Sequence, residues 1–136
     1  MNRLEFQSLA RIRLREARAL LRAGHHDGAY YLAGYSVECA LKACIARRTK
    51  RHDFPDKRTV DASYTHRLED LVRVAELQKS LSTSMRSDPA LALNWAVVKD
   101  WNEETRYERK TRHQARDLVR AISGQHGVLQ WARRHW

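Results

Sequence analysis

The stretch DGAYYLAGYSVECALKACIA, residues 27–46, predicts how the rest of this chain folds. On a helix that turns about 100° per residue, its one clearly polar strip is formed by Glu38 and Lys42, one turn apart. Every other direction is apolar, and many of the side chains there are small. Such a helix is typical of the middle of a bundle, where neighbouring backbones approach closely. We expect Asp27 to be its N-cap.

The length and composition favour one folded domain over residues 1–136. The chain is 43% apolar and contains four tryptophans, which argues against disorder. It has no run of about 18 apolar residues, and charges near its N-terminus interrupt the apolar core that a signal peptide needs. We therefore expect a soluble, cytoplasmic protein with no membrane partner.

The net charge of +10 is the strongest signal in the composition. An excess of this size favours a polyanionic partner, most often a nucleic acid. An acidic protein or a membrane surface would also satisfy it, and a solvated basic surface needs no partner at all. Charge alone does not choose among these.

The only two cysteines, Cys39 and Cys44, lie five residues apart on the central helix. That spacing turns them about 140° away from each other, which disfavours both a mutual disulfide and a shared metal site. We expect both to be small, buried core residues. The sequence has no zinc-binding pattern and no glycine-rich phosphate loop, so no metal or cofactor is expected.

The first helix is expected over residues 4–21, with one apolar face and one basic face. The basic face is either solvated or able to track phosphates, and it is formed by Arg11, Arg15, Arg18 and Arg22. Arg13 is the exception, because its angle places it within the apolar face. A charge there needs a partner, and our hypothesis is that Arg13 neutralises Glu38 between the first two helices.

The middle of the chain gives signals of differing clarity. The basic segment 47–55 ends in a proline, and the region up to Tyr64 is expected to be a loop that can contact a partner. A third helix is expected to start near Thr65, where His66 is interpreted as an ordering residue. Asp88 followed by proline predicts the start of a fourth helix, which residues 101–105 are expected to bend or end.

The last helix is expected to start near Arg106 and run to Ala121 or beyond, then to continue or restart after Gly124. Its core face contains Ala115 and Leu118. The opposite, basic face spans about 80° of arc at ideal helical pitch. It consists of Arg106, Arg109, His113, Arg116 and Arg120. Lys110 adds a further cation beside it. No strand-like alternation occurs, so the fold class is all-α.

Several of these residues resemble the HEPN domain family. They are DGAYY at 27–31, AGYSVECALKA at 33–43, the Thr65–His66 pair, and the pattern NW…VKDW…TRYE at 94–108. The resemblance extends from about residue 8 to 133. It implies an antiparallel, up-and-down bundle of four to five helices that commonly forms a homodimer.

The resemblance also implies two kinds of function. Many members are metal-independent endoribonucleases with an Arg-x4-6-His motif near the start of a late helix, paired across the dimer. Others lack the motif and act as binding or regulatory modules. Several pair with a small nucleotidyltransferase in toxin and antitoxin systems, so the implied partners are RNA or a nucleotide, a second copy, and possible nucleotidyltransferases.

The candidate motif here is Arg106 and His113, with six residues between them. An imidazole could take the proton of a ribose 2′-OH or protonate the leaving 5′-oxygen, and a guanidinium could hold the scissile phosphate. Two departures from the active family pattern are Tyr107, where a small polar residue is usual, and Ala115, where toxins paired with nucleotidyltransferases carry the aromatic that is modified.

Two hypotheses follow for this chain. The first is a metal-independent endoribonuclease, in a toxin or phage-defence setting, with Arg106 and His113 as catalytic residues. The second is a non-catalytic module that binds a nucleic acid, a nucleotide or a partner protein. In both, the binding residues are Arg109, Lys110, Arg116 and Arg120. If the motif lines a dimer cleft, Trp101 or Tyr107 should be buried at the interface.

Overall fold

The computed structural model describes residues 1–49 and 56–136, and every regular element within them is helical. In chain order the elements are α1 (Arg3–Arg22), α2 (His26–Arg48), α3 (Lys57–Ala62), α4 (Leu68–Val74), α5 (Gln78–Ser87), α6 (Pro89–Val98), η1 (Glu103–Tyr107), α7 (Arg112–Ser123) and α8 (Val128–Arg133). The all-α prediction is confirmed, with more and shorter helices than the expected four to five. No described helix is long and apolar enough to cross a membrane.

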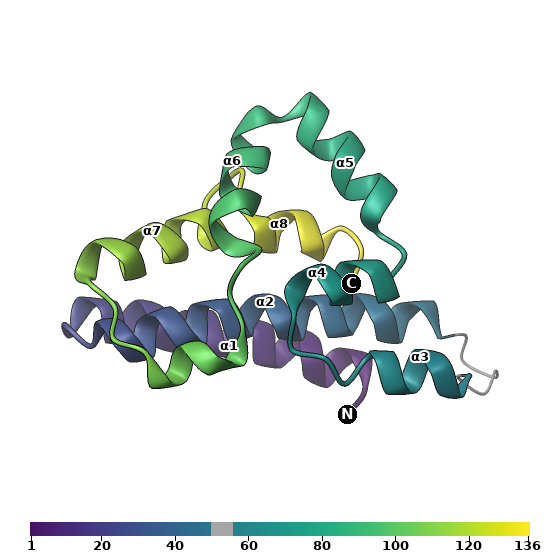
Figure 1. Ribbon diagram of the computed structural model, residues 1–136, viewed down its shortest axis with the longest axis horizontal. Coiled ribbons are helices and arrows are strands. Elements are labelled where there is room, and N and C mark those ends of the chain that lie inside the picture. Colours follow the sequence, from purple (N-terminus) through teal and green to yellow (C-terminus); the bar gives the residue numbers. More distant parts are fainter. Residues whose placement is uncertain (50–55) are drawn as a thin grey trace.

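The predicted central helix is α2, and the other helices are arranged around it (Figure 1). The helix α1 runs alongside it, while α4, α7 and α8 pack on its other sides. Its apolar directions are buried, as expected, including both cysteines. Burial raises the pKa of each thiol, Cys39 and Cys44, to about 12, so both are held as neutral core side chains.

The turn between α1 and α2 differs from the prediction at its cap. The N-cap of α2 is His25, and Asp27 lies inside the first turn of the helix. Gly24 closes the turn with a φ of +86°, a conformation that glycine adopts without strain. The Asp27 carboxylate is thereby free to accept a hydrogen bond from a distant segment, described below.

A close contact explains where the chain passes over α2 after α6. The indole ring of Trp101 lies directly against Gly34, where an added Cβ would collide with its Nε1 atom. The same ring stacks on Tyr31, with 5.9 Å between the ring centroids. Trp101 is 1% exposed. The glycine in the central helix therefore seats this tryptophan, and the tryptophan fixes the start of the segment that carries the candidate motif.

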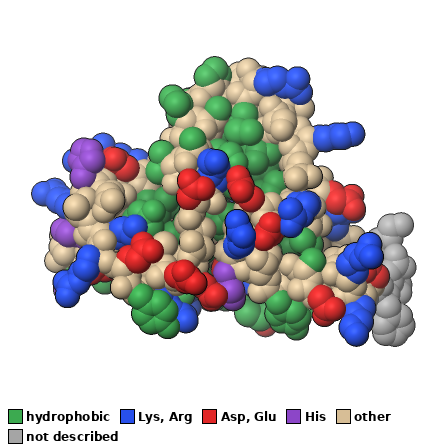
Figure 2. Space-filling model, viewed as in Figure 1, with side chains coloured by type: hydrophobic (Ala, Val, Ile, Leu, Met, Phe, Trp, Pro, Cys, Tyr) green, Lys and Arg blue, Asp and Glu red, His purple; other side chains and the backbone are tan. Residues whose placement is uncertain are grey.

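The middle of the chain is more helical than the sequence suggested. Part of the expected loop forms α3, capped by the Asp56 side chain, which accepts the Thr59 N–H at 3.0 Å. The remainder of its basic part, residues 50–55, lies outside the described residues. The predicted start at Asp88 and Pro89 is confirmed as the beginning of α6. Helices α5 and α6 rise above the body, and hydrophobic side chains gather beneath them (Figure 2).

The late region is not the continuous helix that the sequence predicted. Residues 103–107 form the short η1, residues 108–111 are extended or irregular, and α7 begins only at Arg112. A capping box sets this start, because Thr111 accepts the N–H of Gln114 at 3.1 Å and the Gln114 side chain accepts the N–H of Thr111 at 3.0 Å. The helix ends at Gly124, and α8 restarts after Gly127.

Candidate nucleic-acid interface

The segment between η1 and α7 is held against the core by its backbone. Asp27 Oδ1 accepts the backbone N–H of Lys110 at 2.6 Å. The Lys110 ammonium lies 4.5 Å from the ring centroid of Tyr30 and 2.9 Å from the Glu108 carboxylate. These contacts fix the backbone at the middle of the candidate motif and leave the neighbouring side chains free to point outward. Among them, Arg109 is exposed.

Arg106 and Tyr107 form an exposed pair at the end of η1. The Arg106 guanidinium lies over the Tyr107 ring, 4.8 Å from its centroid. Hydrogen bonding to Tyr107, and more weakly to Tyr31, raises the pKa of Arg106 further above its ordinary value, so it stays cationic. Tyr107 itself is 78% exposed, which makes it the largest exposed aromatic surface on this segment. A cation and an aromatic plane are thus presented together.

His113 lies in the first turn of α7, with its side chain 73% exposed. Arg116 Nη2 is 2.7 Å from Nδ1 of the imidazole, and Asp117 Oδ2 is 3.5 Å from Nε2. Because a guanidinium can only donate, Nδ1 must accept, and the ring is then neutral with its proton on Nε2. In this arrangement the Nε2–H can donate a hydrogen bond, and the imidazole can take up a proton, and so become an acid, only after Arg116 has moved away from Nδ1.

The predicted basic stripe is therefore divided between two elements. Arg106 and Arg109 lie before the capping box, whereas His113, Arg116 and Arg120 share one face of α7. The expectation of one continuous helical face was wrong. Thr111 is the N-cap of α7 and has an extended backbone, so no helix runs from Arg106 into α7. Arg106 and His113 consequently have separate neighbours, Tyr107 for the first and Arg116 with Asp117 for the second.

A cavity of about 430 Å³ opens beside this segment, at the turn between α1 and α2. Its walls are Gly24, His25, His26, Asp27, Gly28, Arg109 and Lys110. Two of the predicted binding residues, Arg109 and Lys110, thus share a cavity with two histidines. Nδ1 of His26 is buried there without a hydrogen-bond partner in the described residues. The sequence pattern gave no reason to connect these histidines with Arg109.

The structure corrects the expected partner of Arg13. Its guanidinium bonds both carboxylate oxygens of Glu16, one turn away on α1, at 2.7 and 2.8 Å. Glu38 is instead paired with Lys42 at 3.4 Å and with His66 Nδ1 at 2.9 Å. A partner on the same helix lets Arg13 remain half-exposed, so its charge is satisfied without being desolvated between two helices.

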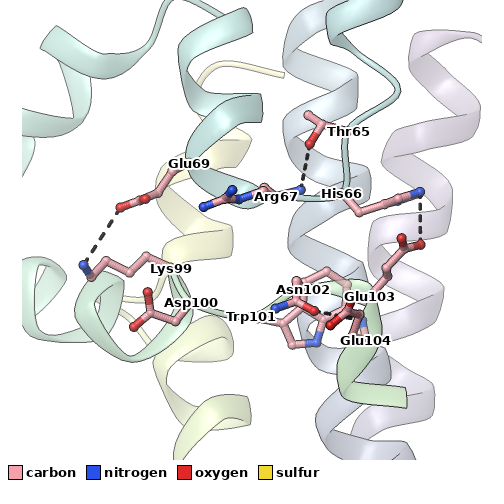
Figure 3. Close-up of a pocket in the computed structure, with 10 residues that line it drawn as sticks. All are labelled: Thr65, His66, Arg67, Glu69, Lys99, Asp100, Trp101, Asn102, Glu103 and Glu104. Atoms are coloured by element: carbon pink, nitrogen blue, oxygen red, sulfur yellow. Dashed lines mark hydrogen bonds and ion pairs between the residues drawn. The ribbon is translucent and has the colours of Figure 1, made fainter. Parts of the chain in front are cut away.

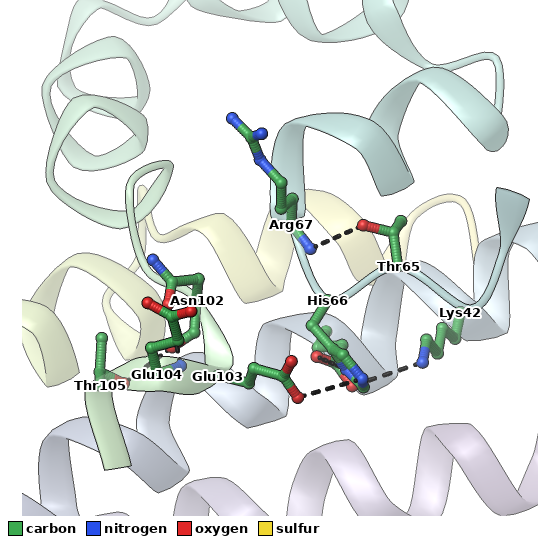
Figure 4. Close-up of polar contacts among 9 residues, drawn as sticks. Lys42, Thr65, His66, Arg67, Asn102, Glu103, Glu104 and Thr105 are labelled. Atoms are coloured by element: carbon green, nitrogen blue, oxygen red, sulfur yellow. Dashed lines mark hydrogen bonds and ion pairs between the residues drawn. The ribbon is translucent and has the colours of Figure 1, made fainter. Parts of the chain in front are cut away.

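The residues around His66 form a polar cluster that sequence reasoning did not assemble (Figure 4). In addition to its contact with Glu38, His66 places Nε2 3.2 Å from Glu103 Oε2, on η1. Each ring nitrogen of His66 therefore faces a carboxylate oxygen from a different element. We call Glu38, Lys42, His66 and Glu103 the His66 cluster. It ties α2, the start of α4 and η1 together around a glutamate that is 2% exposed.

A cleft of about 500 Å³ lies beside this cluster (Figure 3). Basic and acidic side chains both line it, and the Lys99 ammonium lies 3.9 Å from Glu69 Oε1 across it. Figure 2 shows the same interspersed charges on this face of the molecule. Thr65 Oγ1 accepts the Arg67 N–H at 3.1 Å and shapes the chain as it enters α4. The sequence signal was available, since Glu38 occupied the only polar strip of an otherwise apolar helix and required cations.

Trp101 also departs from expectation, because it is buried inside the subunit. Its packing against Gly34 and Tyr31 leaves it no surface for a second copy, whereas Tyr107 is exposed. Among the described residues, no group of three or more His, Cys, Asp or Glu side chains is placed to hold a metal ion.

Comparison with known proteins agrees with the arrangement of helices. The family model for the HEPN domain matches residues 6–135, which is nearly the whole chain. No curated protein matches the sequence, and no solved structure matches the fold.

Proposed function

This chain belongs to the HEPN family, whose domains are generally related to RNA or nucleotides, and we propose that it binds single-stranded RNA. The binding surface would run from Arg106 and Tyr107 across Arg109 and Lys110 to the exposed face of α7, with Arg116 and Arg120. The cavity at the α1–α2 turn would receive one nucleotide.

One observation carries the proposal. The backbone of the segment is clamped by the Asp27–Lys110 hydrogen bond, while Arg106, Tyr107 and Arg109 remain exposed. A rigid backbone that presents cations next to an open aromatic ring suits an unpaired strand, since phosphates meet the cations and a base stacks on the ring. A solvated basic face would not need either the clamp or the exposed tyrosine.

The charges on this surface also favour a polyanion. Between residues 106 and 120 the sequence has six Lys and Arg residues and only two carboxylates. In the described part of the chain, Arg109, Arg112 and Arg120 form no ion pair, although Lys110 pairs with Glu108. Cations without internal partners are available to replace the counterions of a phosphate backbone, which makes binding depend on salt.

The proposal is tested by measuring fluorescence anisotropy with labelled single-stranded RNA over a range of salt concentrations. We expect Arg109→Ala/Arg120→Ala to weaken binding and to reduce the salt slope by about 0.7 for each phosphate that the variant no longer neutralises. Tyr107→Ala should weaken binding by about tenfold, because a base can no longer stack on the ring. The matched control is Lys79→Ala/Arg86→Ala on α5, which removes the same charge elsewhere. Equal weakening in both double variants would refute a localised surface.

A second candidate function is metal-independent cleavage of the bound RNA. The observation that favours it is the exposure of His113, whose side chain is 73% exposed. Once Arg116 leaves Nδ1, the imidazole can take up a proton there, and the resulting imidazolium can protonate a leaving 5′-oxygen. Arg106 would hold the phosphate. A homodimer would supply a second imidazole as the base, and Tyr107 is the exposed aromatic available for such an interface.

Cleavage of mixed single-stranded RNA in excess EDTA separates the two functions. If the protein is a ribonuclease, the wild type cleaves and His113→Ala binds RNA without cleaving it. If neither protein cleaves while both bind, the binding function stands alone. Sedimentation of the free and RNA-bound protein tests the homodimer directly.

A further inference from the structure

A second basic surface lies on α1, and the proposed RNA site does not use it. Leu4, Ser8, Arg11, Arg15 and Arg18 fall on one stripe of this helix, within about 80° of arc. We refer to Arg11, Arg15 and Arg18 as the α1 arginine stripe. All three are exposed, and in the described residues none of them pairs with a carboxylate. Glu16, an acid on the same helix, is occupied by Arg13.

A groove runs between this stripe and α8. It encloses about 350 Å³ and is lined by Ser8, Arg11, Ile12, Leu14, Arg15, Arg18, Leu129 and Arg133. Four of these eight residues are arginines and none is acidic. The lining also includes the aliphatic residues Ile12, Leu14 and Leu129, so the groove combines cations with apolar side chains. We propose that this groove docks an acidic, amphipathic helix of a partner protein.

Contacts within the free protein already position part of the groove. The Arg11 guanidinium lies 4.8 Å and the Arg133 guanidinium 5.6 Å from the ring centroid of Trp136. Arg3 Nη2 donates to the main-chain oxygen of Trp136 at 2.7 Å, which fixes the end of the chain against α1. Two of the four cations are therefore already positioned by an aromatic ring, and less side-chain entropy is lost when an anion binds them.

The apolar surface favours a protein helix over a nucleic acid. Leu4 is 72% exposed at one end of the stripe, and Ile12 is half-buried in the groove. The nearby aromatic, Trp136, is 7% exposed and covered by arginines, so it offers no base a stacking surface. A phosphate backbone has nothing to place on Leu4 or Ile12. An amphipathic helix has both components, because its apolar residues and its carboxylates occupy adjacent stripes.

The spacing also fits a helix. The arginines of the stripe are separated by four and then three residues. Carboxylates at positions i, i+4 and i+7 of a partner helix repeat that spacing on one face. From Leu4 to Arg18 the stripe is about 21 Å long, which is about four helical turns. Bidentate arginine–carboxylate pairs along this length would set the register of the partner.

The test uses a synthetic helical peptide of about five turns, with glutamates at i, i+4 and i+7 and leucines on the adjacent stripe. The control peptide has the same composition in scrambled order. We expect the wild type to bind the first peptide at least tenfold more tightly than the second, as measured by fluorescence anisotropy. Arg15→Glu/Arg18→Glu should reduce binding of the first peptide by at least tenfold. Arg109→Glu/Arg120→Glu makes the same change in net charge and should retain it.

Three results would overturn the proposal. The scrambled peptide could bind equally well, which would reduce the effect to net charge. Both double variants could lose the peptide to the same degree, which would remove the groove as the location. Arg15→Glu/Arg18→Glu could abolish binding of single-stranded RNA, which would make the groove part of the RNA path. Failure of the RNA proposal itself would be seen separately, in Arg109→Ala/Arg120→Ala.

Discussion

The His66 cluster and the α1 arginine stripe differ in whether their charged side chains are buried and paired. In the cluster, Glu38 is buried and contacts both Lys42 and His66, and His66 bridges two carboxylates. On the stripe, Arg15 and Arg18 are exposed and have no carboxylate partner in the described residues. Buried charge must be matched internally, because the cost of leaving it unpaired is several kcal/mol. Exposed charge carries no such cost, so unpaired cations indicate where a partner can bind.

The largest effect on stability is expected from His66→Ala. This change leaves the buried Glu38 carboxylate with Lys42 alone and releases Glu103 on η1. We expect the free energy of unfolding to fall by about 3 kcal/mol, the usual cost of breaking a buried pair. Urea denaturation followed by circular dichroism measures it. A decrease below about 0.5 kcal/mol would mean that water replaces His66 fully and that the cluster does not stabilise the fold.

The contrast between these regions also explains what the sequence could predict. Periodicity identified α1 and α2 because burial repeats with the helical turn, and Asp88 with Pro89 marked the start of α6. The partners of Glu38 could not be chosen in the same way. Lys42 lies one turn away, but His66 comes from a separate element. Periodicity contains no information on which distant residues meet across a bundle.

The limit of what periodicity can predict also applies within the candidate site. The residues from Arg106 to Arg120 fit one helical stripe, and that pattern concealed the helix start at Thr111. The sequence did contain the signal, since Thr111 and Gln114 have capping-box spacing, but a long periodic pattern obscured it. The clamp from Asp27 was hidden because an aspartate at the start of a helix is normally interpreted as a cap. The six-residue α3 has no apolar period to detect.

The next largest effect on stability is expected at the hydrogen bond between Asp27 and the Lys110 N–H. Asp27→Ala removes the acceptor for the Lys110 N–H, and a hydrogen bond to a charged group contributes about 2 kcal/mol. Stability should fall by that amount, and RNA affinity should fall too, although no cation has been changed. Asp27→Asn keeps an acceptor oxygen and should recover most of both quantities. Reduced stability with unchanged RNA binding would show that the segment does not need to be rigid to bind.

A smaller effect is expected at Asp88, a half-buried charge that has an internal partner. A hydrogen bond from His126 lowers the pKa of Asp88, with a further contribution from the Leu91 N–H. A carboxyl whose pKa is lowered by folding stabilises the folded state above its unfolded pKa, and that contribution is lost as the pH falls through the folded pKa. In His126→Ala, carbon NMR should show Asp88 titrating at a higher pH. An unchanged titration would assign the shift to the helix cap alone.

The smallest effect on stability is expected from Arg15→Ala/Arg18→Ala. Both side chains are exposed without an ion pair in the described residues, so the free energy of unfolding should change by less than about 0.5 kcal/mol. Removing two like charges from a chain of net charge +10 relieves repulsion, and a slight stabilisation at low salt is the expected sign. Urea denaturation at two salt concentrations measures both points. Destabilisation by more than about 1 kcal/mol would mean that these arginines are structural, like His66, and would remove the reason for assigning them to a partner.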